Sequence, residues 1–318
     1  MITVAKDNSG DFNSIQDAIN SITSYPETIF VKSGVYYEKL ELKRSDVSVI
    51  GEDREGTIIT YNDYAKMPME DGTNRGTFRS YTMLAIGDNI TLKNLTIENS
   101  AGFGGVVGQA VALFIEGNGI KVDNCKLLGH QDTLYTGPLP KKEKAPGGFR
   151  GPTEFAKRRV GNMCFTDCYI CGEVDFIFGS AIAYFENCHI HCLNRGEKVN
   201  GYMTAPSTYE GCRYGYVFNK CDITGNCPDN TFYLGRPWRI YGKTVLLNCR
   251  IGSHIMPELF HDWNKPESHD TSYFGIYNCE YDNFDKERKA GFVHILTDEE
   301  ALEYSKEKVL SYSFDEVF

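Results

Sequence analysis

The chain has 318 residues, of which 41% are hydrophobic and 24% charged, a composition typical of a folded globular protein. Thirty-three Lys and Arg residues stand against 43 Asp and Glu residues, and the resulting net charge of -10 argues against a nucleic-acid-binding protein. No apolar run approaches the ~20 residues of a membrane-spanning helix, so we expect no membrane partner.

The first residues predict a short helix that covers one end of the fold. Asn13 is the expected N-cap, with Gln16 three residues later. We therefore expect a helical cap over about residues 11–23. Four apolar residues follow at helical spacing: Ile15, Ala18, Ile19 and Ile22.

A short sequence pattern recurs along the chain and predicts a solenoid. The first copy, LKNLTI at residues 92–97, places a short polar residue and then a small apolar residue between larger apolar ones. Successive copies lie 20 to 43 residues apart, as expected for solenoid turns with occasional insertions. Six later copies have a cysteine at the small apolar position: Cys125, Cys168, Cys188, Cys221, Cys249 and Cys279.

The repeats are rich in β-branched and apolar residues, as in ITLKNLTI and TVLLNC, so each turn should consist of strands. We expect an all-β parallel β-helix in a single domain over residues 1–318. The Asn or Asp before most repeat cysteines suits a left-handed bend and predicts a polar ladder at one corner. The repeat cysteines should stack in the core as free thiols.

Two further segments do not follow the repeat. Residues 141–159 hold seven Lys and Arg residues against two Glu residues, which makes this insertion basic in an acidic protein. The tail, about residues 284–318, contains the charged stretch TDEEALEYSKEKVL, which predicts helix along the outside of the solenoid.

Four segments offer candidate chemistry: GQAVAL with Gln109, GHQDTLY with Gln131 and Asp132, GEVDFIFGSA with Asp175, and YLGRPW with Arg236 and Trp238. Each also has a purely structural interpretation. Asp132 could close a turn, and Asp175 could be a buried ion-pair partner of Arg236. Solenoid stacking would nevertheless bring such segments together on one face.

In combination these segments resemble the pectin methylesterases, or pectinesterases, carbohydrate esterases with a right-handed parallel β-helix. DNSGDFNSIQDAI, SGVYYEKL and YMTAPST belong to the same resemblance, which spans roughly residues 2 to 265 in the family's order. It implies hydrolysis of the C6 methyl esters of galacturonate units in pectin, with release of methanol and without a cofactor or metal. The implied partners are methyl-esterified homogalacturonan or oligogalacturonides, and we expect a monomer.

The resemblance also implies residue roles. Asp175 matches the nucleophile, Asp132 the general acid and base, and Arg236 the partner of the nucleophile. Gln109 and Gln131 match the amides that stabilise the oxyanion. Four aromatic residues are expected to bind substrate: Trp238, Phe176, Tyr135 and Trp263.

Other functions remain open at this point. A galacturonan-binding or galacturonan-backbone-cleaving β-helix protein would share the architecture. The basic insertion is expected to contact uronate carboxylates through Lys157, Arg158 and Arg159, or else to be a solvated loop. The absence of a visible signal sequence and the many cysteines favour a cytoplasmic location, the alternative being a secreted protein whose signal lies outside this sequence.

Overall fold

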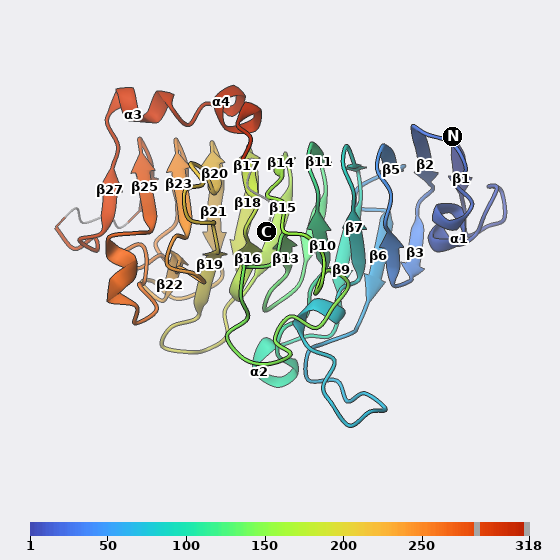
Figure 1. Cartoon of the computed structure of the whole chain (residues 1–318), viewed down its shortest axis with the longest axis horizontal. Helices are drawn as coiled ribbons and strands as arrows, with labels where there is room; N and C mark the ends of the chain where they lie inside the picture. The colour runs from blue at the N-terminus through green and yellow to red at the C-terminus, as the bar shows by residue number, and fades with distance from the viewer. Residues whose placement is uncertain (283–286, 315–318) are drawn as a thin grey trace.

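The computed structural model describes residues 1–282 and 287–314, and it winds into a parallel β-helix built from three sheets (Figure 1). Every strand pair in the three sheets is parallel, and each sheet takes one strand from successive turns. The predicted fold is therefore confirmed. No helix among the described residues is long and apolar enough to cross a membrane.

The strands fall into the following sheets. Sheet A contains β1 (Ile2–Val4), β2 (Glu27–Val31), β5 (Val47–Gly51), β8 (Thr91–Lys93), β11 (Ile120–Asp123), β14 (Asn162–Thr166), β17 (Ile182–Glu186), β20 (Tyr216–Asn219), β23 (Lys243–Leu247), β25 (Tyr273–Tyr277) and β27 (Val293–Ile295). Sheet B contains β3 (Gly34–Tyr37), β6 (Thr57–Tyr61), β9 (Thr96–Asn99), β12 (Lys126–Leu128), β15 (Tyr169–Gly172), β18 (His189–Cys192), β21 (Asp222–Gly225), β24 (Arg250–Ile251) and β26 (Glu280–Tyr281). Sheet C contains β4 (Leu40–Leu42), β7 (Met83–Ile86), β10 (Leu113–Glu116), β13 (Leu134–Thr136), β16 (Val174–Gly179), β19 (Gly201–Pro206) and β22 (Phe232–Gly235).

The interior of the solenoid is filled by equivalent residues of successive turns. Phe185 lies between Phe165 and Phe218, with ring centroids 4.6 and 4.4 Å apart. The repeat cysteines also stack, and the thiol of Cys188, for example, lies 3.6 Å from the carbonyl oxygen of Phe165 in the preceding turn. All eleven cysteines are free thiols, as predicted, and of the six repeat cysteines only Cys279 near the C-terminal end is partly exposed.

The predicted polar ladder forms at the corner between sheets A and B. Asn124 donates to Asn94 at 2.9 Å, and Asn278 donates to Asn248 at 2.9 Å. The four residues adopt a left-handed backbone conformation, with φ between 47° and 54°. Lys220 takes the place of the Asn or Asp in its turn, with the same left-handed backbone. The side-chain amide of Asn248 in the next turn therefore donates to the neighbouring Asn219.

The N-terminal cap is the helix α1 (Ile15–Asn20), but its N-cap is Ser14 and not Asn13. Ser14 accepts a hydrogen bond from the backbone N–H of Asp17, while Glu38 accepts from the N–H groups of Ile15 and Gln16. Asn13 instead bonds Asn8. The prediction was one residue early because Asn and Ser are both good N-caps and stand side by side.

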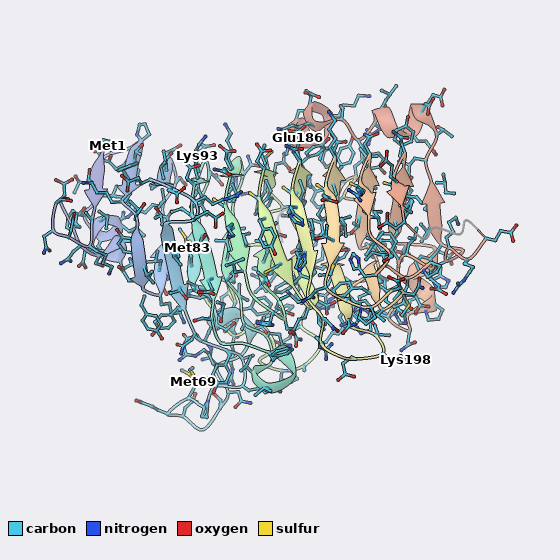
Figure 2. All side chains as sticks on the ribbon, turned by 180° about the vertical axis from the view of Figure 1, so that it is seen from behind. Met1, Met69, Met83, Lys93, Glu186 and Lys198 are labelled. Carbon is cyan, nitrogen blue, oxygen red and sulfur yellow. The ribbon has the colours of Figure 1, made fainter. Side chains whose placement is uncertain are left out.

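The tail beyond β27 forms two short helices, α3 (Asp298–Leu302) and α4 (Lys306–Ser311), which fold back over sheet A (Figure 1). Lys306 pairs with Glu186, which lies under these helices when the molecule is seen from behind (Figure 2). Val309 is fully buried. The helical prediction is confirmed, although residues 284–286 and 315–318 of the predicted tail lie outside the described residues.

Candidate active site

A cleft of about 310 Å³ opens on the outer face of sheet C, and we call it the central cleft. It is lined by residues from turns far apart in sequence, together with Thr77, Phe78 and Gly148 from segments between the strands. The short helices η1 (Thr77–Arg79) and α2 (Gly104–Val107) belong to segments bordering this face. Seven predicted site residues line the cleft together: Gln109, Gln131, Asp132, Asp175, Arg236, Trp238 and Trp263.

Asp175 reaches the cleft because strand β16 is irregular. The register with β19 shifts between Val174 and Ile177, and Asp175 adopts φ 51°. Such a bulge re-aims a side chain, and Asp tolerates this backbone better than most residues. The carboxylate accepts two hydrogen bonds from Arg236, from Nε at 2.8 Å and from Nη2 at 2.7 Å. Asp175 is thus held in one orientation by a bidentate charged pair.

Arg236 is itself fixed by two aromatic rings. Its guanidinium carbon lies 3.7 Å from the ring centre of Tyr202 and 3.7 Å from that of Trp263. Stacking of this kind holds the planar fork that pairs with the carboxylate. Trp263 therefore lies in the cleft as predicted, but it also positions Arg236. Tyr202 was missed as a site residue, although it opens the YMTAPST segment quoted for the resemblance.

Asp132 is buried beside this pair, and it too has a left-handed backbone, with φ 65°. Burial, followed by the negative charge of Asp175, raises the pKa of Asp132 well above the ordinary value. Burial also raises the pKa of Asp175, but the hydrogen bonds and charge of Arg236 and the charge of Lys265 oppose that rise. The two carboxyl groups therefore differ in their surroundings, since only Asp175 is hydrogen-bonded to a guanidinium.

The two glutamines flank the carboxylates on neighbouring turns. The carbonyl of Gln131 accepts from the N–H of Ala110, so the backbone of one glutamine segment is tied to that of the other at 3.0 Å. Gly104 packs against Gln131 so closely that a Cβ there would lie 2.6 Å from the Cβ of Gln131. Any larger residue at position 104 would therefore clash with Gln131.

A buried carboxylate that the sequence analysis missed supports this region. Glu173 is fully buried, and its oxygens contact Nδ1 of His130 at 2.7 Å and the N–H of Gly104 at 3.2 Å. Glu173 lies two residues before Asp175, and His130 lies two before Asp132. The contact ties together the segments that carry both aspartates. The signal in the sequence was a second acidic residue in GEVDFIFGSA.

Two of the predicted substrate-binding aromatics do not reach the cleft. Phe176 is fully buried inside the solenoid beside Phe232, because the bulge that turns Asp175 outward turns Phe176 inward. Tyr135 lies on the outer face of sheet C but is completely covered by other aromatic rings, with Phe78 at 5.1 Å and Phe114 at 4.5 Å between centroids. Both predictions are corrected: Phe176 is a core residue, and Tyr135 supports the cleft from beneath.

The aromatic residues that do line the cleft include two that were not predicted, Phe78 and Phe178. Phe178 lies 5.8 Å from Trp238 in an edge-on arrangement, and Phe78 lies 6.4 Å from it with nearly parallel rings. Phe78 comes from a loop far outside the quoted motifs. Only the three-dimensional path of that loop brings it to Trp238.

The basic insertion meets the cleft with its first part and not its last. Arg158 is buried and donates to the carbonyl groups of Thr153, Glu154 and Ala156, while Arg159 pairs with Asp88. The last part of the insertion thus stabilises its own loop and a corner of the solenoid. Gly148, by contrast, lines the cleft.

The described residues contain no group of three or more His, Cys, Asp or Glu side chains arranged to hold a metal ion. The central cleft holds two buried carboxyl groups, a guanidinium bound to one of them, two amides and an aromatic wall.

Comparisons with known proteins agree on one family. The family model described as Pectinesterase matches residues 1–139 and 158–313. Pectinesterase 31 of Arabidopsis thaliana is 33% identical over 289 residues, covering 88% of this chain and 82% of that protein. Some curated relatives are longer, and the chain spans 53% of the length of Pectinesterase/pectinesterase inhibitor 18 of the same plant.

Solved structures give the same result. Pectin methylesterase PemA from Erwinia chrysanthemi superposes with a TM-score of 0.80 at 29% identity, covering 98% of this chain and 97% of that chain. A pectin methylesterase in complex with a hexasaccharide gives a TM-score of 0.81 at 29% identity over the same shares of the two chains. The family match over nearly the whole chain, together with the parallel β-helix, shows that this chain belongs to the pectinesterase family of carboxylic ester hydrolases.

Proposed function

We propose that the central cleft hydrolyses the C6 methyl esters of galacturonate units in pectin, with Asp175 as the nucleophile. The observation that carries this assignment is the bidentate pair of Asp175 with Arg236 beside the buried Asp132. The family relationship supports the reaction, and a relative of known structure binds a hexasaccharide.

The first half of the reaction uses both carboxyl groups. A carboxylate oxygen of Asp175 attacks the ester carbonyl carbon, and the carbonyl oxygen becomes an oxyanion. The side-chain amides of Gln109 and Gln131 donate hydrogen bonds to it, a contribution of about 3 kcal/mol for each well-placed donor. Protonated Asp132 then gives its proton to the departing methoxy oxygen, so methanol leaves and an acyl-enzyme anhydride remains.

The second half restores the enzyme. Asp132, now ionised, takes a proton from a water molecule whose oxygen attacks the anhydride. The bond to Asp175 breaks, so Asp175 regains its negative charge and the galacturonic acid is released, which then loses its proton to solvent. Arg236 stabilises that charge and keeps the carboxylate oriented, while each oxygen retains a lone pair for attack.

The walls of the cleft suit a sugar polymer. Trp238 and Trp263 offer aromatic surface, backed by the buried rings of Phe78 and Phe178, and the apolar faces of pyranose rings pack well on such surface. The polar groups gather at the carboxyl groups, where one C6 ester would lie. This arrangement favours esterase chemistry at a sugar substituent over cleavage between sugars.

The test is a product analysis on highly methyl-esterified galacturonan. The purified protein should release methanol and titratable carboxyl groups in equal amounts, with no new reducing ends and no unsaturated uronides. New reducing ends or unsaturated products would assign the protein to backbone cleavage. Binding of the polymer without any product would make it a carbohydrate-binding protein.

A further inference from the structure

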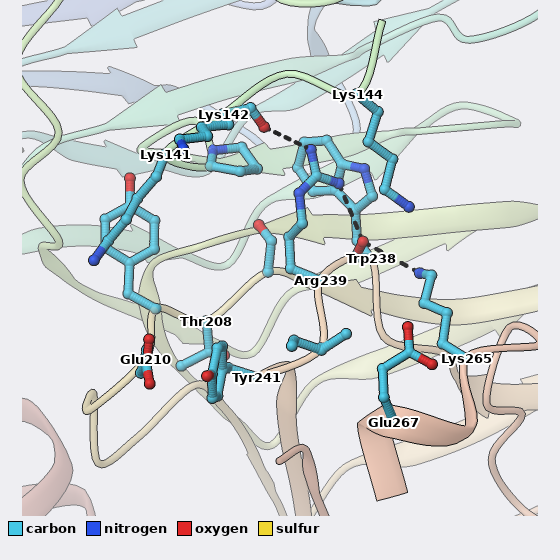
Figure 3. Close-up of a pocket in the computed structure, with 14 residues that line it drawn as sticks. Lys141, Lys142, Lys144, Thr208, Glu210, Trp238, Arg239, Tyr241, Lys265 and Glu267 are labelled. Carbon is cyan, nitrogen blue, oxygen red and sulfur yellow. Dashed lines mark hydrogen bonds between the residues drawn. The ribbon is translucent and has the colours of Figure 1, made fainter.

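A second cavity, of about 440 Å³, adjoins the central cleft, and Trp238 lines both (Figure 3). We call it the basic cavity. Part of its wall comes from Lys141, Lys142 and Lys144 of the insertion. The match to the family leaves out residues 140–157, so this wall is built from a segment that the family pattern does not cover.

The basic cavity has an excess of positive charge in a protein of net charge -10. Two carboxylates, Glu210 and Glu267, face five cations around it. In the part of the chain that the structure describes, four of these cations form no ion pair with a carboxylate: Lys142, Lys144, Arg239 and Lys265.

Two of the cations are held in place by the backbone around Trp238. Arg239 donates to the carbonyl of Lys142 at 3.1 Å and to that of Trp238 at 3.1 Å, while Lys265 donates to the carbonyls of Pro237 and Trp238. Figure 3 shows Lys144 and Lys265 reaching toward the same side of Trp238. Arg239 also lies over the ring of Trp238 and Lys265 over that of Trp263, so the partners of these two cations are neutral carbonyl groups and aromatic rings.

This crowding has an electrostatic cost. Burial, followed by the charges of Lys144 and Arg239, lowers the pKa of Lys265 to about 7. A bound anion would offset the repulsion among the cations, and the cavity is open to one because Lys142 and Lys144 are exposed.

We propose that the basic cavity binds the carboxylate of a galacturonate unit that has already lost its methyl ester, close to the unit whose ester lies in the central cleft. This inference rests on the proposed function, since that reaction produces such carboxylates on the same polymer. A neutral methyl ester in the basic cavity gains no comparable attraction. The protein therefore prefers partly de-esterified chains over fully esterified ones.

Two double variants of equal charge change test the proposal. Lys142→Ser with Lys144→Ser removes two cations of the basic cavity. Lys157→Ser with Arg159→Ser removes two cations from the same insertion that line neither cavity. The side chains in the first pair are exposed, and the ion pair of Arg159 is on the surface, so both proteins should fold.

The first measurement is calorimetric binding of fully de-esterified hexagalacturonide, which needs no catalysis. The cavity variant should bind at least about fivefold more weakly than wild type at low salt, and the control variant should stay within about twofold. High salt should reduce the difference between them. Equal affinity of the two variants, or no binding by wild type, would overturn the proposal.

The second measurement is methanol release from two pectins, one partly de-esterified and one fully methyl-esterified. The cavity variant should show a raised KM only on the partly de-esterified pectin, with kcat unchanged. A rise on both pectins would contradict a carboxylate site. If wild type released no methanol at all, the proposed reaction would fail, whereas the calorimetric result would still decide whether the cavity binds uronate.

Discussion

The interior of the solenoid and the central cleft are built on the same turns but follow opposite rules. Inside, equivalent residues repeat, as the stack of Phe165, Phe185 and Phe218 shows. In the cleft nothing repeats: each turn contributes a different side chain, and buried carboxyl groups replace apolar ones. The difference shows that the repeat provides stability, whereas function appears where the repeat is interrupted.

The interruption can be located on one strand. Strand β16 pairs regularly with β13 through Leu134 and Ile177, but its register with β19 shifts just at Asp175. The left-handed backbone occurs at ladder residues such as Asn124 and at both cleft aspartates. In the ladder it allows the chain to turn a corner, and in the cleft it directs a carboxylate outward.

The largest effect on stability should come from breaking the stack. Phe185→Ala should lower the free energy of unfolding by about 3–5 kcal/mol, because it leaves a cavity between two stacked rings. The activity of the remaining folded protein should be nearly unchanged. Urea denaturation and methanol release check this, with Phe155→Ala, whose side chain is 92% exposed, as the control. A large loss of kcat in Phe185→Ala would contradict the claim that the solenoid interior provides stability without taking part in function.

Changing Asp132 should lower activity but raise stability. Asp132→Asn should lower kcat by about 10² or more, because no proton can be given to methanol. The same change should raise the Tm at neutral pH, since folding no longer has to protonate a buried carboxyl group that is ionised in the unfolded chain. A variant that is active, or one that is less stable at neutral pH, would contradict this role.

The pH dependence sharpens that expectation. The pKa of Asp132 is raised in the folded protein, so between the ordinary value near ~4 and the raised value the folded state binds more protons. Wild-type stability should therefore fall as the pH rises through this window, and the gain from Asp132→Asn should vanish at lower pH. Tm measured against pH for both proteins tests the sign.

The smallest effect is expected in the ladder. Asn124→Ala should lower the free energy of unfolding by about 1–2 kcal/mol, since it loses the bond to Asn94 and strains a backbone with φ 47°. Asn124→Gly also loses this hydrogen bond, but glycine adopts the left-handed backbone without strain. Its loss of unfolding free energy should therefore be smaller than that of Asn124→Ala. Neither variant should change kcat. Equal losses of unfolding free energy in the two variants would mean that backbone strain does not contribute.

The sequence predicted what repeats or what belongs to a contiguous motif. The spacing of the cysteines and the polar residues before them predicted the turns, the core thiols and the ladder, because each depends on local chain conformation. The motif residues Asp132, Asp175 and Arg236 were predicted through family resemblance, and the structure places them in one cleft.

The sequence could not show what depends on the relative position of distant segments. Phe176 was assigned to the substrate although the bulge in β16 turns its side chain into the core. The apolar residues on both sides of Asp175 give no sign of that bulge in the sequence. Tyr135 was also assigned to the substrate. The sequence does not show that Phe78, which lies far away along the chain, covers the ring of Tyr135. Arg158 was expected to contact uronate carboxylates or to lie in a solvated loop, but its guanidinium donates to carbonyl groups of its own loop.

The most direct test of the account is methanol release by Asp175→Asn beside Asp167→Asn. Asp167 also has a left-handed backbone, with φ 54°, but it belongs to the ladder and is exposed, so it is a matched control. Asp175→Asn should lose at least about 10² in kcat, because an amide cannot form the acyl-enzyme, while Asp167→Asn keeps its activity. If Asp175→Asn retained more than about a tenth of wild-type methanol release, Asp175 would not be the nucleophile.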